Sequence, residues 1–479
     1  MVIALDVGTS SARAAAYDDT GRRVEHRFHS ESYTPSMTAE GGVEHDPARL
    51  LDAIATCLDA VTTADHSDQI IGVGVSTFWH GLCGFDRTGG AVTPLYMWAD
   101  TRSTGDADLL RGALDAEALH ARTGCALHAS YWPAKLRWLL RTRPVETRRV
   151  ARWGSFGEYL ELALFGEAAT SVSMASATGL FDQDAGRWDA EALAAAEIDD
   201  SRLFPLAERT RFRQGLRSRW ARRWPALRSV PWFPAVGDGA ASNVGSACVS
   251  PARVALNVGT SAALRIVTST PMRPPRGLWR YRIDRATSIV GGATSEGGNV
   301  FAWCENTLRL PEPRGLEGAL EAAVPDAHGL TVLPFLAGER SPGWRDGRRA
   351  VIAGLALDST PMDILRAALE AVALRLARIY ELLGPLAAPE HAVVASGGAI
   401  ARSRAWTGII ADALGHPLLV SRETEATSRG AAVLALHALG ILPTLEAAHL
   451  DGDLVAPDPG HHARYRVALA RQQDLDEKV

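Results

Sequence analysis

Two common phosphate-binding loops are missing from this sequence of 479 residues. Only two of its 50 basic residues are lysines, Lys135 and Lys478, and neither follows a glycine. The Walker A pattern requires a Gly-Lys pair, so it is absent. The dinucleotide pattern G-x-G-x-x-G also fails, because Gly72 and Gly74 are followed by Thr77 where the third glycine belongs. A nucleotide, if one is bound, must be held by another kind of turn.

The sequence also has little that is typical of membrane, secreted or nucleic-acid-binding proteins. It contains no apolar run of roughly 18 residues, which predicts no membrane span. The segment 1–10 has an acid and no basic region, unlike a signal peptide. A net charge of −5 supplies no positive field for nucleic acid. The five cysteines are scattered and form no C-x-x-C pair, so a local zinc or redox motif is excluded and a cytoplasmic protein is favoured.

The most informative feature that is present is an internal repeat. VIALDVGTSSARAAAY at residues 2–17 is matched by VALNVGTSAALRIV at residues 254–267. In each copy an apolar run leads into Gly-Thr-Ser and then into a second apolar run. This order predicts a β-hairpin whose turn contains glycine. Two copies so far apart indicate two related lobes rather than a short-period solenoid.

Strand-like and helical patterns alternate along both halves. The first half predicts strands over Arg23–His29 and Ile70–Ser76, and between them a helix that begins at Pro47 after the N-cap Asp46. Later strand and helix patterns cover Ser130–Arg141, Phe156–Phe165, Pro361–Gly384, His391–Ser396, Ser403–Leu414 and Thr427–Leu439. This alternation predicts the α/β class.

Two segments depart from the alternation. Leu203–Phe233 is rich in arginine and aromatic residues without a clear period, and we interpret it as a surface insertion with a solvated arginine face. A nucleic-acid patch is the alternative for that segment. The tail 451–479 is polar, with Asp, Pro and Gly at its start, which predicts a loose end.

Three glycine-rich turns carry the candidate phosphate chemistry. They are Gly8-Thr9-Ser10, Gly259-Thr260-Ser261 and Gly397-Gly398. Glycine lets backbone N–H groups approach phosphate oxygens, and Thr and Ser hydroxyls add donors. Two matched hairpins that face each other would hold a triphosphate from both sides.

The two hairpins differ at one position that matters for a metal. Asp6 stands in the first copy where Asn257 stands in the second. A carboxylate suits Mg²⁺, usually through water, whereas an amide keeps the shape and loses the charge. The difference therefore predicts one metal site, at Asp6, between two phosphate clamps.

At this point the sequence resembles the FGGY carbohydrate kinases, over about residues 1–440. Its hairpins match the two phosphate motifs of that family, and Ala350–Glu370 fits the C-terminal signature. Leu333–Trp344, LPFLAGERSPGW, is similar to a family loop, and Lys135–Trp138 is similar to the core of the N-terminal signature, although Trp132 departs from it. The resemblance implies two actin-like ATPase (ribonuclease H-like) lobes with a cleft between them, and it implies ATP and Mg²⁺ as cofactors.

The resemblance also implies a division of labour between the lobes. Residues 1–245 would form the N-terminal lobe, with the sugar site and the base, and residues 246–450 the nucleotide-binding lobe. Val236–Ser246 looks like the segment that contains the general base, which would be Asp238. A carboxylate there would take the proton of the attacking hydroxyl. Nucleotide contacts would come from the two hairpins together with Gly298, Gly397, Gly398, Ala399 and Ser403.

The resemblance implies that the acceptor is a small sugar, sugar acid or polyol. Trp79-His80 and the segment with Trp98, Asp100 and Arg102 resemble sugar-contacting segments, and Arg102 is the candidate partner for a carboxylate. Met174–Leu193 looks like the gluconate kinase branch, which makes gluconate the best candidate. Trp79 and Glu296 depart from that branch, and Glu296 would repel a carboxylate if it faced the pocket.

Two alternatives stay open. One is a kinase for xylulose or another ketose or polyol. The other is a nucleotide-dependent binding protein on the same fold that transfers no phosphate, since fold alone does not fix function. The presence of Asp238 and of the polar segments around Trp79 and Trp98 favours a kinase. The oligomeric state is undetermined, with a homodimer as one option.

Overall fold

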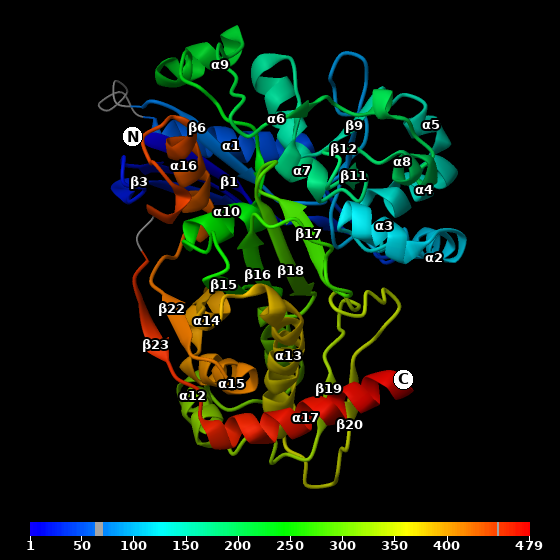
Figure 1. Cartoon of the computed structure of the whole chain (residues 1–479), viewed down its shortest axis with the longest axis vertical. Helices are drawn as coiled ribbons and strands as arrows, with labels where there is room; N and C mark the ends of the chain where they lie inside the picture. The colour runs from blue at the N-terminus through cyan, green and yellow to red at the C-terminus, as the bar shows by residue number, and fades with distance from the viewer. Residues whose placement is uncertain (63–69, 448–449) are drawn as a thin grey trace.

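The computed structural model describes residues 1–62, 70–447 and 450–479, and it contains two α/β lobes, each built around a main sheet (Figure 1). The first sheet has the order β14-β6-β1-β2-β3 and the second has the order β17-β18-β16-β15-β21-β22-β23. The first comprises β1 (Val2–Val7), β2 (Ser11–Tyr17), β3 (Arg23–Ser32), β6 (Val73–Thr77) and β14 (Val236–Gly237). The second comprises β15 (Arg253–Val258), β16 (Ala262–Thr268), β17 (Trp279–Arg282), β18 (Ser288–Thr294), β21 (Ala392–Ser396), β22 (Leu418–Ser421) and β23 (Gly452–Val455).

The predicted repeat is confirmed as a repeat of topology. β1 pairs antiparallel with β2 and parallel with β6. In the same way, β15 pairs antiparallel with β16 and parallel with β21. Asp6 and Asn257 occupy equivalent places, because each lies opposite a serine of the parallel neighbour, Ser76 and Ser396.

The helices begin where local chemistry favours them. α1 (Pro47–Val61) has Asp46 as its N-cap, and the Asp46 side chain accepts from the N–H of Ala48. α13 (Pro361–Leu383) begins with a capping box between Thr360 and Asp363. The helices of the first lobe are α2 (Thr104–Ala113), α3 (Ala116–Thr123), α4 (Trp132–Thr142), α5 (Pro144–Thr147), α6 (Phe156–Phe165), α7 (Val172–Ser176), α8 (Ala190–Ala195), α9 (Ser218–Arg223) and α10 (Asp238–Gly245). Those that follow are α11 (Gly298–Thr307), α12 (Pro313–Ala322), α14 (Gly398–Arg402), α15 (Arg404–Leu414), α16 (Ala426–Ala438) and α17 (Pro459–Lys478).

The lobes meet where α10 crosses α16. A Cβ atom added at Gly245 would be 1.8 Å from the carbonyl oxygen of Ala426, and one added at Gly430 would be 1.8 Å from that of Ala241. Only glycine at both positions lets the two backbones touch. Figure 1 shows α16 (orange) beside β1 and β6, although it lies late in the chain. The second half of the sequence therefore supplies part of the first core.

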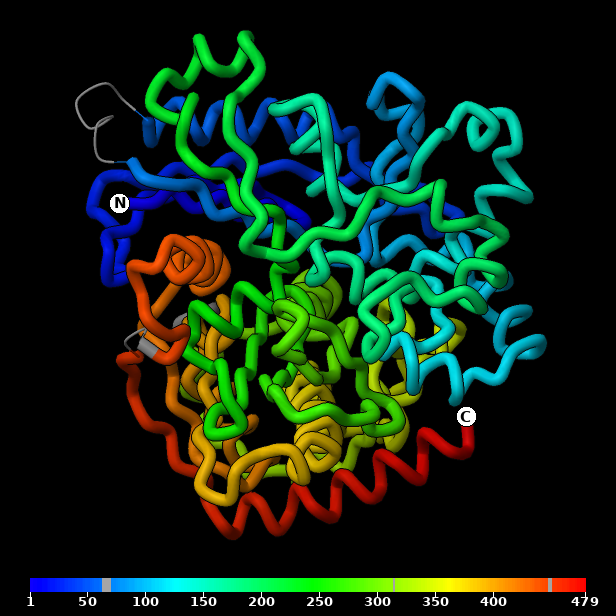
Figure 2. Tube along the Cα trace, turned by 45° about the horizontal axis from the view of Figure 1, so that its top comes forward, coloured from blue at the N-terminus to red at the C-terminus, as the bar shows by residue number. Residues whose placement is uncertain are grey.

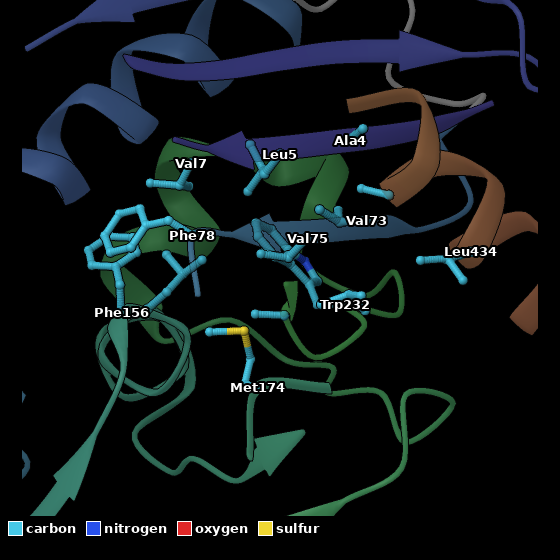
Figure 3. Packing of buried hydrophobic residues seen from close by; sticks show 14 of the residues in the cluster. Ala4, Leu5, Val7, Val73, Val75, Phe78, Phe156, Met174, Trp232 and Leu434 are labelled. Carbon is cyan, nitrogen blue, oxygen red and sulfur yellow. The ribbon is translucent and has the colours of Figure 1, made fainter. Parts of the chain in front are cut away.

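The core of the first lobe extends below its sheet (Figure 3). Phe78 and Phe156 stack with their ring centroids 6.4 Å apart, and Met174 and Trp232 join the same cluster. Trp232 belongs to the segment 203–233, which we expected to be a surface insertion. That expectation is wrong for its tryptophans, since all three of them, Trp220, Trp224 and Trp232, are buried. The segment has no clean period because it is anchored by separate aromatic side chains rather than by one amphipathic element.

The prediction of a loose tail is also wrong. β23 pairs with β22, and α17 packs on α13, α15 and the short strand β19 (Thr331–Leu333). Figure 2 shows α17 (red) running along the edge of the second lobe. Its inner face, Tyr465, Ala468, Leu469, Gln472 and Asp476, has helical spacing. Gln472 and Asp476 are polar, and both are buried with hydrogen-bond partners. Because hydrophobicity alone counts them as exposed, it does not detect this buried face.

Small sheets of two or three strands lie outside the two main sheets. They are formed by β4 (Ser36–Met37), β5 (Val43–His45) and β8 (Leu95–Tyr96), by β7 (Cys83–Phe85) and β9 (Arg152–Gly154), by β10 (Thr170–Ser171) and β13 (Leu206–Ala207), by β11 (Phe181–Asp182) and β12 (Arg187–Trp188), and by β19 and β20 (Val351–Ala353). Within the described ranges, every helix is too short or too polar to cross a bilayer.

Candidate active site

Two side chains hold the first glycine turn through hydrogen bonds to its backbone carbonyl groups. The hydroxyl of Tyr33 donates to the carbonyl of Gly8 at 2.7 Å, and Nε2 of His45 lies 2.9 Å from the carbonyl of Thr9. The hydroxyls of Thr9 and Ser10 have no hydrogen-bond partner among the described residues. These donors fit a phosphate group.

The second turn is a cradle of close backbone contacts. The N–H of Gly298 donates to the carbonyl of Gly259 at 2.7 Å, and a Cβ added at Gly298 would be 2.9 Å from that oxygen. Gly397 has a φ of +104°, and a Cβ there would be 2.5 Å from the carbonyl of Val258. The structure thus brings Gly259, Gly298 and Gly397 together, with Thr260 at the exposed tip.

The predicted adenosine residues continue from this cradle. Gly398 begins α14, and Ala399 is buried. A Cβ added at Gly298 would lie 3.8 Å from that of Ala399. Ser403 is less available, because it is the N-cap of α15 and its hydroxyl donates to Glu317 at 3.0 Å. Its hydroxyl is therefore engaged in capping a helix.

Asp6 is a buried carboxylate that accepts from one side-chain donor among the described residues. It is 3% exposed, and Nη1 of Arg13 donates to it at 3.2 Å. Burial raises the pKa of Asp6 to about 7, and the negative charge of Asp238 adds to that rise. The equivalent Asn257 instead donates to the hydroxyl of Ser396 at 3.2 Å.

The chemistry at Asp6 fits a magnesium ion bound mainly through phosphate and water. Its carboxylate oxygens and the free hydroxyls of the first turn are hard ligands of the kind Mg²⁺ prefers. Asp6 belongs to no cluster of three protein ligands. Among the described residues, Asp326, His328 and Glu370 form the one such cluster, and arginines already bind its carboxylates.

Asp238 is the first residue of α10 and is half-buried. The N–H of Gly239 donates to its Oδ1 at 2.8 Å. Burial raises the pKa of Asp238, while the positive charges of Arg265 and Arg340 oppose that rise. A carboxylate that titrates above its usual range is a better proton acceptor when ionised.

Trp79 and His80 are buried, and Trp79 packs against the glycines on either side of Asp238. The indole N–H of Trp79 donates to the carbonyl of Ser173 at 3.1 Å, and its ring meets the edge of Tyr281 at 4.9 Å. Nδ1 of His80 lies 2.7 Å from the carbonyl of Ala177. Burial lowers the pKa of His80, so its imidazole is neutral near pH 7.

A cavity of about 440 Å³ lies between the lobes. Trp98 and Asp100 line it from the first lobe, and Ser295 and Arg340 line it from the second. Its size and polar lining suit a small polyhydroxy molecule. Of the predicted sugar contacts, the cavity thus includes Trp98 and Asp100, whereas Trp79, His80 and Arg102 are outside its lining.

Arg102 is already neutralised by carboxylates of its own lobe. Its Nη2 donates to Asp100 at 2.5 Å and to Glu44 at 2.8 Å, and its guanidinium lies over the ring of Trp138. These carboxylates offset its charge and Arg102 is outside the cavity lining, so the geometry does not favour the expected contact with a substrate carboxylate, which stays a prediction. Its observed effect is to hold Asp100 in place.

Glu296 does not repel a ligand in the cavity. It is 2% exposed, lies outside the lining, and accepts a hydrogen bond from the N–H of Ala337 at 3.1 Å. Burial raises its pKa to about 7. Arg265 and Arg340 are site residues that the sequence motifs did not single out, although Arg340 lies in the loop Leu333–Trp344 and Arg265 follows the second Gly-Thr-Ser turn by four residues.

Known proteins are similar to this chain over nearly its full length. A gluconokinase from Bacillus subtilis (strain 168) is 26% identical over 463 residues, which cover 93% of this chain and 89% of that protein. Crystal structures of a ligand-bound xylulose kinase and of a gluconate kinase, both from Lactobacillus acidophilus, each superpose with a TM-score of 0.90 at 24% identity. They cover 100% of this chain and 98% and 97% of theirs, and they show the two-lobed fold.

The two lobes also match separate family descriptions. Residues 1–245 match the N-terminal domain of the FGGY family of carbohydrate kinases, and residues 254–439 match its C-terminal domain. Kinases of this kind transfer phosphate from ATP, with Mg²⁺, to an alcohol group. The hairpins, the carboxylate at the start of α10 and the interlobe cavity therefore lie in a chain that belongs to the FGGY family of carbohydrate kinases.

Proposed function

We propose that this kinase phosphorylates a hydroxyl of a small sugar acid, with gluconate as the best candidate. The observation that carries the proposal is the interlobe cavity, whose second-lobe wall contains Arg340, which forms no salt bridge with any carboxylate in the part of the chain that the structure describes. A relative over 93% of the chain is a gluconokinase. Xylulose is the second candidate, because a xylulose kinase shares the fold.

In the proposed reaction Asp238 is the general base. As the acceptor oxygen bonds to the γ-phosphorus of ATP, the bond between that phosphorus and the β–γ bridging oxygen breaks and ADP leaves. The hydroxyl proton passes to the carboxylate of Asp238. Asp238 is outside the lining of the interlobe cavity, but it is near enough to Arg340 of the cavity wall for their charges to interact. That proximity, its half-buried place at the start of α10 and its raised pKa support this role.

ATP would be held by the turns of both lobes. The first turn would offer Gly8, Thr9 and Ser10, and the second Gly259 and Thr260. Adenosine would lie beside Gly397, Gly398 and Ala399. Mg²⁺, held at Asp6 through water, would neutralise phosphate charge. In this proposal residues 1–245 supply the base and sugar contacts, and residues 246–450 supply most nucleotide contacts.

Closure of the lobes is part of the proposal. Groups from both lobes must approach the transferring phosphoryl group and exclude water, or ATP would be hydrolysed. The glycine contact between α10 and α16 supports a rigid pivot. Small-angle scattering with sugar and a non-hydrolysable ATP analogue should give a smaller radius of gyration than the free protein gives.

The central experiment is an ADP-release assay with a panel of aldonates, ketoses and polyols, followed by phosphorus NMR of the product. We expect the highest kcat/KM for a six-carbon aldonate. Faster turnover of xylulose or of an uncharged polyol would overturn the sugar-acid proposal and favour the second candidate.

We also expect a cytoplasmic location, which the five buried free thiols support.

A further inference from the structure

The charges around the interlobe cavity are unevenly paired. Three carboxylates line it, those of Glu40, Asp100 and Asp346, and the last two are paired with arginines that are outside its lining. Asp100 accepts from Arg102 at 2.5 Å, and Asp346 accepts from Arg111 at 2.9 Å. Asp346 also lies 2.8 Å from Nε2 of His128. The charges of Asp100 and Asp346 are thus largely neutralised, while their oxygens can still accept hydrogen bonds from hydroxyl groups.

Arg340 has no such partner. Its guanidinium carbon lies 5.0 Å from the centroid of the Trp98 ring, its Nε is buried without a hydrogen bond, and it forms no ion pair within the described ranges. An aromatic face attracts a cation but supplies no lone pair, so the N–H donors of the guanidinium stay available. A buried donor without an acceptor is costly, and an anionic ligand would remove that cost.

The neighbouring basic residue is different. Arg349 also lines the cavity, but it is exposed, and its Nη1 donates to the backbone carbonyls of Asp346 and Arg348. Only Glu40, an exposed residue at the rim, adds an acid without a salt bridge. Arg340 is therefore the lining cation that combines a buried donor, an aromatic support and no salt bridge among the described residues, although its charge also acts on the carboxylate of Asp238.

We propose that Arg340 binds the carboxylate of the acceptor and so selects sugar acids over neutral sugars. The inference rests on the proposed sugar-acid function and assigns its specificity to one residue. Guanidinium and carboxylate match in shape and charge, and such bonds are stronger than those between neutral groups. Trp98 would fix the guanidinium, and the paired acids Asp100 and Asp346 would be left to meet hydroxyl groups.

The test compares two ligands that differ only at the charged end, gluconate and gluconamide. Calorimetry without ATP measures the binding of each to the wild-type protein and to the Arg340→Gln and Arg340→Lys variants. In the wild type we expect gluconate to bind more tightly than its amide. In Arg340→Gln that preference should fall by about 10- to 100-fold, the range for charge-assisted hydrogen bonds, while Arg340→Lys should keep part of it.

A matched control removes one positive charge from the same cavity. Arg349→Gln should reduce the preference by far less than Arg340→Gln, because Arg349 is solvated at the rim. Circular dichroism should show the wild-type fold in each variant. Equal losses for gluconate and gluconamide in Arg340→Gln, or equal effects of the two arginine substitutions, would overturn the inference.

The failure of this inference can be told apart from failure of the proposed function. If gluconate binds through Arg340 but is not phosphorylated, the inference stands and the proposed substrate is wrong. If gluconate is phosphorylated and Arg340→Gln affects it no more than a neutral polyol, the function stands and the inference is wrong. A wild-type protein that binds no aldonate would overturn the inference whatever else it phosphorylates.

Discussion

The indole ring of Trp79 lies directly against Gly237: a Cβ atom added at that glycine would be 1.9 Å from Cε2 of the ring. On the other side of Asp238, a Cβ at Gly239 would be 2.4 Å from the same indole. The glycines that flank the proposed base are therefore required by a tryptophan. Trp79, which departs from the expected branch pattern, positions the backbone of Asp238.

Gly237→Ala should consequently damage both stability and turnover. The methyl group cannot fit without moving the indole or the start of α10, and such overpacking costs about 1–3 kcal/mol or more. Thermal unfolding should show a lower midpoint, and kcat should fall because Asp238 is displaced. Gly408→Ala is the control, since Gly408 lies in α15 and an added Cβ meets nothing within 4 Å. A Gly237→Ala protein as stable and active as this control would contradict the packing argument.

Asp238→Asn should remove the base and keep the shape. We expect kcat to fall by about 10²–10⁴-fold, the usual worth of a positioned base. The KM for ATP should change little, because Asp238 would act on the acceptor. Steady-state kinetics with the best acceptor would measure both values. Near wild-type turnover in this variant would assign the proton transfer to another group.

Arg265→Gln should shift the acidic limb of the plot of kcat/KM against pH. Asp238 accepts a proton only when ionised, so kcat/KM falls as the pH drops through its pKa. Burial raises that pKa, and the positive charge of Arg265 opposes the rise. Without Arg265 the pKa of Asp238 should rise further, and the acidic limb should move to higher pH. A limb that stays in place or moves to lower pH would exclude this electrostatic link.

Asp6→Asn should leave the fold intact, since Asn257 occupies the equivalent place in the second lobe. Loss of the negative charge should reduce turnover strongly and should weaken the response of activity to the Mg²⁺ concentration, because Mg²⁺ loses a charged anchor. Titration of activity with Mg²⁺ would report both. An unchanged magnesium dependence and turnover would rule out a metal role for Asp6.

Much of the fold could be predicted because its signals are local. The two Gly-Thr-Ser hairpins, the N-cap Asp46 and the long helix after Thr360 each depend on a few adjacent residues, and the structure contains all of them. The pairing of side chains from distant segments gives no such signal. Arg102 seemed free in the sequence, but Glu44, 58 residues earlier, helps to neutralise it.

The tail was mispredicted for a related reason. The inner face of α17 contains Gln472 and Asp476, which count as solvent-facing in a hydrophobicity pattern. In the structure, Nε2 of Gln472 donates to the carbonyl of Val332 at 2.9 Å, and Asp476 accepts from two arginines. Polar residues whose partners lie more than 100 positions away cannot be identified as buried from spacing alone.

Those partners connect the end of the chain to the proposed substrate cavity. Asp476 accepts from Arg345 at 2.6 Å and from Arg375 at 3.2 Å, and both arginines also bind Glu339. Glu339 immediately precedes Arg340 and is 1% exposed. The loop that presents Arg340 is thus held from behind by the last turns of α17.

Asp476→Asn should therefore lower the stability of the second lobe and weaken binding in the cavity at the same time. Both arginines keep Glu339, so the loss should be about 1–3 kcal/mol, that of a charged hydrogen bond rather than of an orphaned buried charge. Asp474→Asn is the matched control, because Asp474 lies on the same helix but pairs only with the exposed Lys478. Thermal unfolding and calorimetry with gluconate would compare the two variants. If Asp476→Asn loses stability yet binds the sugar acid like the control, α17 supports only the lobe; if it loses both, the helix also sets the position of Arg340.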